Sequence, residues 1–126
     1  MKQAVQGTTP GGAYSPGILA EGRFLYVSGQ GPVRDGKTIL GSIEEETRLA
    51  LENLGRVLEQ AGLGYADVVR CGVFITDPAY FDAMNEVYRS VFPEPLPART
   101  TVVSGLVGQI KVEIDCVAVA GGSATG

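Results

Sequence analysis

The chain contains no histidine, and this absence excludes several kinds of active site. Histidine is the commonest general base and metal ligand in proteins, and the Ser-His and Cys-His nucleophile systems both require it. If the protein is an enzyme, its chemistry must therefore depend on carboxylates, arginine, tyrosine, hydroxyl groups and the backbone.

Cysteine is scarce as well, with Cys71 and Cys116 as the two examples in 126 residues. Two cysteines so far apart in the sequence cannot form a CxxC motif or a four-ligand zinc site. Each lies within an apolar run, where small buried thiols commonly occur. We expect both side chains to be buried in the core rather than to act as reactive groups.

Long hydrophobic runs are also missing, since no stretch approaches the roughly 18 apolar residues that a membrane helix needs. The first ten residues have neither the apolar core nor the cleavage pattern of a secretion signal, so the cytoplasm is the expected compartment. Positive charge is limited, because ten Lys and Arg oppose fourteen Asp and Glu and the net charge is −4. This balance argues against a nucleic-acid-binding module, which usually presents a basic face.

Glycine, in contrast, is abundant, with 18 residues or about twice the usual share. These glycines follow no Gly-X-Y period, so collagen is excluded and many tight turns are expected. With 44% hydrophobic residues, the chain fits one compact domain, which we place at residues 1–120. The last residues, 121–126, are small and polar and predict a flexible C-terminal tail.

The first half of the chain predicts a β-hairpin and a helix. Residues 18–20 and 24–28 are apolar runs separated by a glycine-containing turn, which is typical of a hairpin. Ser42 and Glu45 form a capping box at the start of a helix. An apolar stripe of helical spacing follows and ends at Gly62, a favourable residue just beyond a helix end.

The second half predicts three strands and one more helix. Residues 68–76 are rich in β-branched residues and predict a strand, and Asp77-Pro78 then caps a helix that stops at Pro93. The apolar and aromatic stripe of this helix is expected to face the core. Two further strands are expected at 99–103 and 111–120.

This order of elements predicts an α+β fold, a two-layer sandwich in which two helices cover one face of a mixed sheet. The last strand indicates what happens on the other face. Lys111, Glu113 and Asp115 point there at the start of the strand, followed by Val117 and Val119 at its end. Because this face is part charged and part apolar, we expect a second subunit to cover its apolar half and a cleft to lie near its charged half.

Three residues are candidates for chemistry. Tyr14 lies in a glycine-rich loop, Arg99 opens a strand after a proline-stiffened segment, and Glu113 lies on the mixed face of the last strand. An arginine is suited to binding a carboxylate through two parallel hydrogen bonds. Taken singly, each residue is also typical of an ordinary packing or surface position.

Six short motifs occur in order along the chain. They are Ala13–Gly17, Val27–Gln30, Asn53-Leu54, Asn85–Tyr88, Pro97–Thr100 and Val112–Ile114. Together they resemble the RidA family, the YjgF-type proteins that are also labelled endoribonuclease L-PSP or translation initiation inhibitor. The resemblance extends from about Gly7 to Ala120, and the Pro-Ala-Arg-Thr and Val-Glu-Ile motifs are its most specific part.

The resemblance implies a chorismate-mutase-like fold and a homotrimer with three clefts between its subunits. It also implies hydrolysis of reactive 2-enamine and 2-imino acids, such as 2-aminoacrylate, 2-iminopropanoate and 2-iminobutanoate, to 2-oxo acids and ammonia. The family's reaction needs no cofactor and no metal.

Carried over by position, the resemblance assigns Arg99 to the substrate carboxylate and Glu113 to the orientation and activation of water. Tyr14 would close the pocket. The remaining substrate contacts that it implies are made by the backbone of Gly29 and Thr101. Asn85 would lie just behind the residues that touch the substrate. The loop 104–109 departs from the family's pattern, which has a Leu-Pro pair and a basic residue there.

Two alternatives remain open at this point. The chain could form a non-catalytic trimer that uses Arg99 to bind small carboxylic acids. It could also act on RNA as a ribonuclease or translation inhibitor, as the family's labels indicate. The net charge of −4 and the missing histidine make the RNA-directed role the least consistent with the sequence.

Overall fold

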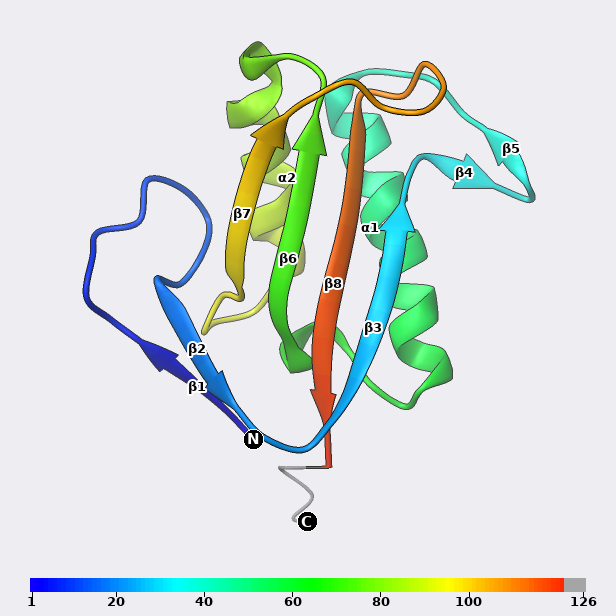
Figure 1. The fold of residues 1–126 in the computed structure, drawn as a ribbon. Coiled ribbons are helices and arrows are strands. Elements are labelled where there is room, and N and C mark those ends of the chain that lie inside the picture. Colours follow the sequence, from blue (N-terminus) through cyan, green and yellow to red (C-terminus); the bar gives the residue numbers. More distant parts are fainter. Residues whose placement is uncertain (122–126) are drawn as a thin grey trace.

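A computed structural model describes residues 1–121 of the protein (Figure 1). Its main sheet has the strand order β3-β8-β6-β7. These strands are Arg23–Gln30, Val112–Ala120, Val68–Ile75 and Ala98–Val103. Strands β6 and β7 run parallel and the other neighbours antiparallel, so the sheet is mixed, as the sequence predicts.

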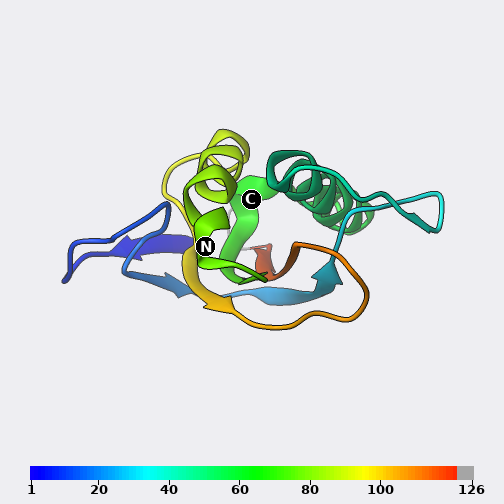
Figure 2. The same ribbon diagram turned by 90° about the horizontal axis from the view of Figure 1, so that it is seen from above.

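Helices α1 (Ile43–Gln60) and α2 (Phe81–Val91) pack side by side on one face of this sheet (Figure 2). Between the two layers lies a core of buried side chains that includes Leu54, Met84, Val73 and Ile114. The predicted two-layer α+β sandwich is confirmed, and the aromatic stripe of α2 faces the core as expected. No helix within residues 1–121 is long and apolar enough to cross a membrane.

The helix ends follow from local chemistry. The backbone N–H of Glu45 donates to Ser42 Oγ at 3.1 Å, and the N–H of Ser42 donates to Glu45 Oε1 at 2.8 Å, which completes the predicted capping box. Beyond the C-terminal end of α1, Gly62 has a φ of 75°, which glycine adopts without strain. Asp77 caps a short 3-10 helix, η2 (Pro78–Tyr80), which leads into α2, so the first turn after the cap is tighter than an α-helix.

The predicted hairpin of residues 18–20 with 24–28 is wrong. Strand β2 (Gly17–Ala20) pairs instead with β1 (Lys2–Val5) in a separate two-stranded sheet, and β3 pairs with β8. The turn between β2 and β3 passes the end of β8 so closely that a Cβ on Gly22 would lie 2.9 Å from Val119 Cγ2. The chain therefore leads β3 onto β8 and does not fold it back on β2 (Figure 1).

Shorter elements complete the molecule. Strands β4 (Val33–Arg34) and β5 (Lys37–Thr38) form a small hairpin before α1, and the 3-10 helix η1 (Tyr65–Asp67) precedes β6. The predicted limit of the domain at residue 120 stays a prediction. Residues 122–126 of the predicted tail lie outside the described residues.

The sheet face opposite the helices carries most of the mixed pattern expected for β8. Glu113, Asp115 and Val117 are half-buried there. The prediction is wrong for Lys111, which lies outside this strand and whose ammonium binds Glu46 on α1 at 3.2 Å. On the neighbouring strand β3, Tyr26 lies opposite Val117 and is 74% exposed. A large aromatic side chain so exposed on a sheet is typical of a surface that another chain covers.

Candidate functional site

The side chain of Arg99 lies on the helix side of the sheet, at the edge strand β7. In register it is opposite Cys71, which is fully buried in the core, and Arg99 itself is only 8% exposed. Its Cζ atom lies 4.8 Å from the ring centre of Tyr88, 5.3 Å from that of Tyr14 and 5.8 Å from that of Phe81. Aromatic faces attract cations, so the three rings hold the guanidinium in place.

This buried cation has no acidic partner, because no carboxylate of residues 1–121 lies within ion-pair distance of Arg99. Burial lowers the pKa of Arg99 from its ordinary value, but an arginine remains protonated in proteins. Buried charges are normally paired, since an isolated one costs several kcal/mol. An unpaired buried arginine therefore indicates a place reserved for an anionic ligand.

Unsatisfied polar atoms gather around the same guanidinium. Within the described chain, six buried side-chain N or O atoms have no hydrogen-bond partner. One of them, Thr47 Oγ1, lies in α1, away from this group. The other five are Arg99 Nε, Arg99 Nη2, Asn85 Oδ1, Tyr88 OH and Thr101 Oγ1. Because each such atom costs about 1–3 kcal/mol when left without a partner, this cluster is typical of a binding site.

A glycine-rich loop passes over Arg99 and brings Tyr14 to it. The backbone N–H of Gly11 donates to Tyr14 OH at 3.0 Å, and the N–H of Ser15 donates to Pro97 O at 3.0 Å, just before β7. A Cβ on Gly12 would lie 3.1 Å from Arg99 Nη2, so glycine permits this close passage. The predicted residues Tyr14, Asn85, Arg99 and Thr101 are thus assembled from three separate segments.

Outside this loop the surface is hollowed. The hollow has a volume of about 310 Å³ and is lined in part by Gly12, Tyr14, Arg89 and Leu96. It borders the loop that covers Arg99, because Gly12 and Tyr14 of that loop line it.

Glu113 and Gly29 form a second group on the opposite face of the sheet. The pairing of β3 with β8 shifts register between Val27 and Gln30, and this irregularity brings Gly29 against Glu113. A Cβ on Gly29 would overlap Glu113 Oε2 and would lie 2.7 Å from Glu113 Cδ. Gly29 therefore leaves the space that the Glu113 carboxylate occupies.

The two groups do not meet within one chain. Arg99 lies on the helix side at β7, whereas Glu113 lies on the other face of β8, and β6 runs between these strands. Two strand spacings correspond to about 10 Å, and the sheet itself separates the side chains. The residues that the sequence predicts as one site are therefore divided into two half-sites, one with Arg99, Tyr14, Asn85 and Thr101, the other with Glu113 and Gly29.

Sequence reasoning missed the roles of Phe81 and Tyr88, whose rings were assigned to the core alone. A signal was available, because Phe81, Asn85 and Tyr88 follow one another at spacings of four and three residues and share one helix face. A polar residue inside an otherwise apolar stripe indicates that the stripe faces something polar. Here that group is the Arg99 guanidinium.

The two cysteines are buried, as the sequence predicts. Cys71 on β6 and Cys116 on β8 lie opposite each other as free thiols. Burial raises the pKa of Cys71 to about 12 and also raises that of Cys116. A thiol of such high pKa carries almost no thiolate at neutral pH, so neither cysteine is suited to nucleophilic chemistry.

Comparisons with known proteins give a consistent result. The sequence pattern of the family described as Endoribonuclease L-PSP matches residues 5–120. Over 112 residues the chain is 43% identical to the mitochondrial protein mmf2 of Schizosaccharomyces pombe, covering 86% of this chain and 88% of the relative. Over 113 residues it is 38% identical to the 2-iminobutanoate/2-iminopropanoate deaminase of Rattus norvegicus, covering 87% and 82%.

A solved structure agrees with these relatives. The crystal structure of E. coli TdcF with bound serine superposes with a TM-score of 0.73 at 33% identity, covering 94% of this chain and 94% of that chain. Since one relative is mitochondrial, the cytoplasmic location expected from the sequence stays a prediction.

Proposed function

Because the chain belongs to the endoribonuclease L-PSP family, the RidA or YjgF type, we propose that it hydrolyses 2-imino acids and their 2-enamino tautomers to 2-oxo acids and ammonia. The observation that carries this proposal is the buried Arg99 guanidinium, in which two nitrogen atoms, Nε and Nη2, have no hydrogen-bond partner within the described residues. An arginine binds a carboxylate through two hydrogen bonds, and a 2-imino acid carries its carboxylate beside the reacting carbon. The name of the rat relative and the serine bound by TdcF, itself a small carboxylate, support this assignment.

The reaction requires little covalent help from the protein. Water adds to C2 of the imine, and the nitrogen gains a proton as the C=N double bond becomes single. The hydroxyl proton of the resulting carbinolamine then passes to its amino nitrogen, and the C–N bond breaks to release ammonia and leave the 2-oxo acid. Arg99 holds the carboxylate, and Glu113 accepts a proton from the attacking water and returns it to the nitrogen.

We further propose that the complete site forms between two copies of the chain in a homotrimer. The separation of Arg99 from Glu113 within one chain supports this, because a neighbouring copy could bring its Glu113 to the Arg99 half-site. The exposed Tyr26 and the half-buried Val117 offer apolar surface for such a contact. Small 2-imino acids such as 2-iminopropanoate and 2-iminobutanoate are the proposed substrates.

The proposal is tested by generating 2-iminobutanoate in place with a threonine dehydratase and adding a scavenger that traps the imine. We expect the wild-type protein to suppress trapping. Arg99→Ala should lose suppression by about a hundredfold or more, because it removes a charge-assisted contact that positions the substrate. Arg99→Lys keeps the charge but not the paired donors, so it should recover only part of the activity.

A matched control is Arg56→Ala, which removes an exposed arginine on α1 and should leave suppression unchanged. A folded, oligomeric wild-type protein that fails to suppress trapping would contradict the proposed reaction.

One observation favours a second candidate, a non-catalytic protein that binds small carboxylic acids. Within residues 1–121, five of the six unsatisfied buried atoms lie around Arg99 and none belongs to Glu113. Glu113→Ala separates the two functions. Turnover lost with carboxylate binding kept identifies the deaminase, whereas a wild type that binds 2-oxobutanoate without any turnover identifies the binding protein.

A further inference from the structure

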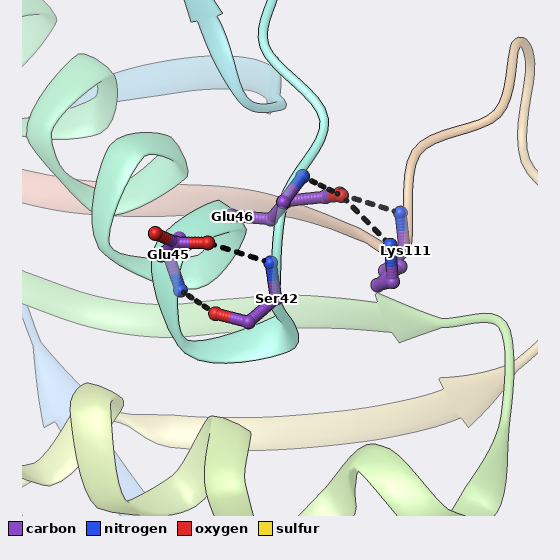
Figure 3. A network of polar contacts seen from close by, with 5 residues as sticks. Ser42, Glu45, Glu46 and Lys111 are labelled. Carbon is purple, nitrogen blue, oxygen red and sulfur yellow. Dashed lines mark hydrogen bonds and ion pairs between the residues drawn. The ribbon is translucent and has the colours of Figure 1, made fainter.

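Helix α1 contains a fully buried carboxylate that the proposed reaction does not use. Glu46 is 0% exposed, although acidic side chains are almost never fully buried unless they are paired. Its Oε1 atom accepts the backbone N–H of Lys111 at 2.7 Å. Its Oε2 atom accepts the N–H of Gly41 at 3.0 Å and the Lys111 ammonium at 3.2 Å, as Figure 3 shows for Lys111.

These contacts fix the chain just before Glu113. Lys111 is two residues ahead of Glu113, and Val112 between them is fully buried at the start of β8. On its other side, Lys111 O accepts the N–H of Thr76 at 3.1 Å. The loop that precedes this anchor is exposed, with Val107 at 94%, so Glu46 marks the point where the chain becomes fixed.

Asn53 makes the corresponding contacts with the chain that follows β3, the strand next to Glu113. It follows Glu46 by seven residues, almost two helical turns, and so lies on the same side of α1. Its Nδ2 atom donates to Gly31 O at 3.0 Å and to Val33 O at 2.7 Å. These carbonyls belong to the chain that leaves β3, just after Gly29.

We propose that Glu46 and Asn53 are positioning residues for the Glu113 carboxylate. Together they tie the start of β8 and the end of β3 to one rigid helix, and this keeps Glu113 against Gly29. The expected fall in kcat rests on the proposed function. The positioning itself can be measured without any substrate.

The two side chains are chemically suited to opposite tasks. Glu46 faces three N–H groups and accepts from all of them, whereas Asn53 faces two carbonyl oxygens and donates to both. Glu46→Gln would turn an NH₂ group toward one of those N–H donors, and Asn53→Asp would turn an oxygen toward carbonyl oxygens. Each substitution keeps the shape of the side chain and reverses part of its hydrogen bonding.

The experiment compares Glu46→Gln and Asn53→Asp with Glu52→Gln, an exposed glutamate on the same helix. Its ion pair with Arg34 lies at the surface, where such pairs contribute little to stability. For both test variants we expect kcat for imine hydrolysis to fall by about ten- to a hundredfold, since small misplacements of a catalytic group have effects of this size. The dissociation constant of 2-oxobutanoate, which Arg99 would hold, should change less than about twofold, because the Arg99 half-site lies elsewhere. Glu52→Gln should leave both quantities unchanged.

A double-variant cycle distinguishes positioning from general loss of structure. In a Glu113→Ala background, assayed at a protein concentration that makes its residual turnover measurable, Glu46→Gln should cause no further loss of that turnover, because the group that it positions is already gone. An equal loss in both backgrounds, or an unchanged kcat in Glu46→Gln, would overturn the proposal. If Glu46→Gln does not fold, Asn53→Asp provides the same cycle from the β3 side.

Amide hydrogen exchange gives the readout that needs no enzyme activity. Both test variants should speed exchange in residues 110–115, and Glu52→Gln should not. If exchange is faster in the test variants but the wild type does not hydrolyse imines, the proposed reaction is contradicted and the positioning of Glu113 is still supported. Unchanged exchange in both variants would refute the positioning, whatever the activity of the wild type.

Discussion

At the scale of single residues, Arg99 is a charged side chain that is buried without an acidic partner in the described part of the molecule. Its contacts with Tyr14, Phe81 and Tyr88 recover part of the energy that burial of the charge requires. A carboxylate ligand would recover more by pairing with the free N–H groups. Arg99 is thus held ready for its ligand before the ligand arrives, which lowers the cost of binding.

The buried cysteines allow a prediction about alkaline pH. Burial raises the pKa of Cys71 to about 12, against about 8.5 for an exposed thiol. Below pH 8.5 the thiol is protonated in both the folded and the unfolded state. Between these values only the unfolded chain loses the proton, so the free energy of unfolding should fall as the pH rises, by at most about 1.4 kcal/mol per pH unit for this group.

Urea unfolding at a series of pH values from about 8 to 10.5 measures this slope. Cys71→Ala leaves a small cavity that lowers stability at every pH, but it should make the decline with pH shallower than in the wild type. An identical slope in the variant would show that Cys71 does not contribute.

Sequence reasoning at this scale singled out Arg99, Tyr14 and Glu113 from the motifs around them, and the roles given to these residues stay predictions. The sequence alone did not show how these three residues are arranged in space. Alternation along β8 places Glu113 on the face away from the core, but no local pattern tells which face Arg99 occupies at the edge strand. That depends on the register of β7 with β6.

At the scale of elements, the irregular pairing of β3 with β8 decides where Glu113 lies. Gly29→Ala introduces a Cβ into the space of the Glu113 carboxylate and should displace it. We expect kcat for imine hydrolysis to fall by about ten- to a hundredfold, while 2-oxobutanoate binding stays close to wild type. Kinetics with the trapping assay and equilibrium binding provide the two measurements.

Gly64→Ala is the matched control for this substitution. Gly64 has extended backbone angles, and a Cβ there meets no atom of the described chain within 4 Å. If both alanine variants kept full turnover, close packing of Gly29 against Glu113 would be irrelevant to the reaction.

The helices and strands also show which features short-range sequence patterns can predict and which they cannot. The capping box at Ser42 and the apolar stripes of both helices are short-range features, and they predicted α1 and α2 well. The hairpin prediction failed because the partner of β3 is β8, about ninety residues further along the chain. Strand β1 was missed because its alternation of Lys2, Gln3, Ala4 and Val5 is too short and too polar to stand out.

At the scale of the whole molecule, the two half-sites predict complementation between inactive variants. Arg99→Ala and Glu113→Ala should each keep at most a small residual activity alone. If each site combines Arg99 of one chain with Glu113 of its neighbour, co-expressed variants that assemble at random should regain about one quarter of wild-type activity. One chain in such a pair supplies the intact Arg99 and the other supplies the intact Glu113.

Differently tagged copies of the two variants allow mixed oligomers to be isolated and assayed for suppression of imine trapping. No recovered activity in verified mixed oligomers would mean that the site does not join these residues from different chains. The oligomers formed by each variant alone serve as the baseline.

The aromatic residues around Arg99 have a consequence for spectroscopy. The chain has no tryptophan and only five tyrosines, so its near-ultraviolet absorption and fluorescence come almost entirely from tyrosine. Two of these chromophores, Tyr14 and Tyr88, lie against the guanidinium of Arg99, the proposed binding group for the carboxylate. A ligand that reaches Arg99 changes the electric field at both rings, and the protein thus carries an intrinsic optical reporter of occupancy that needs no label.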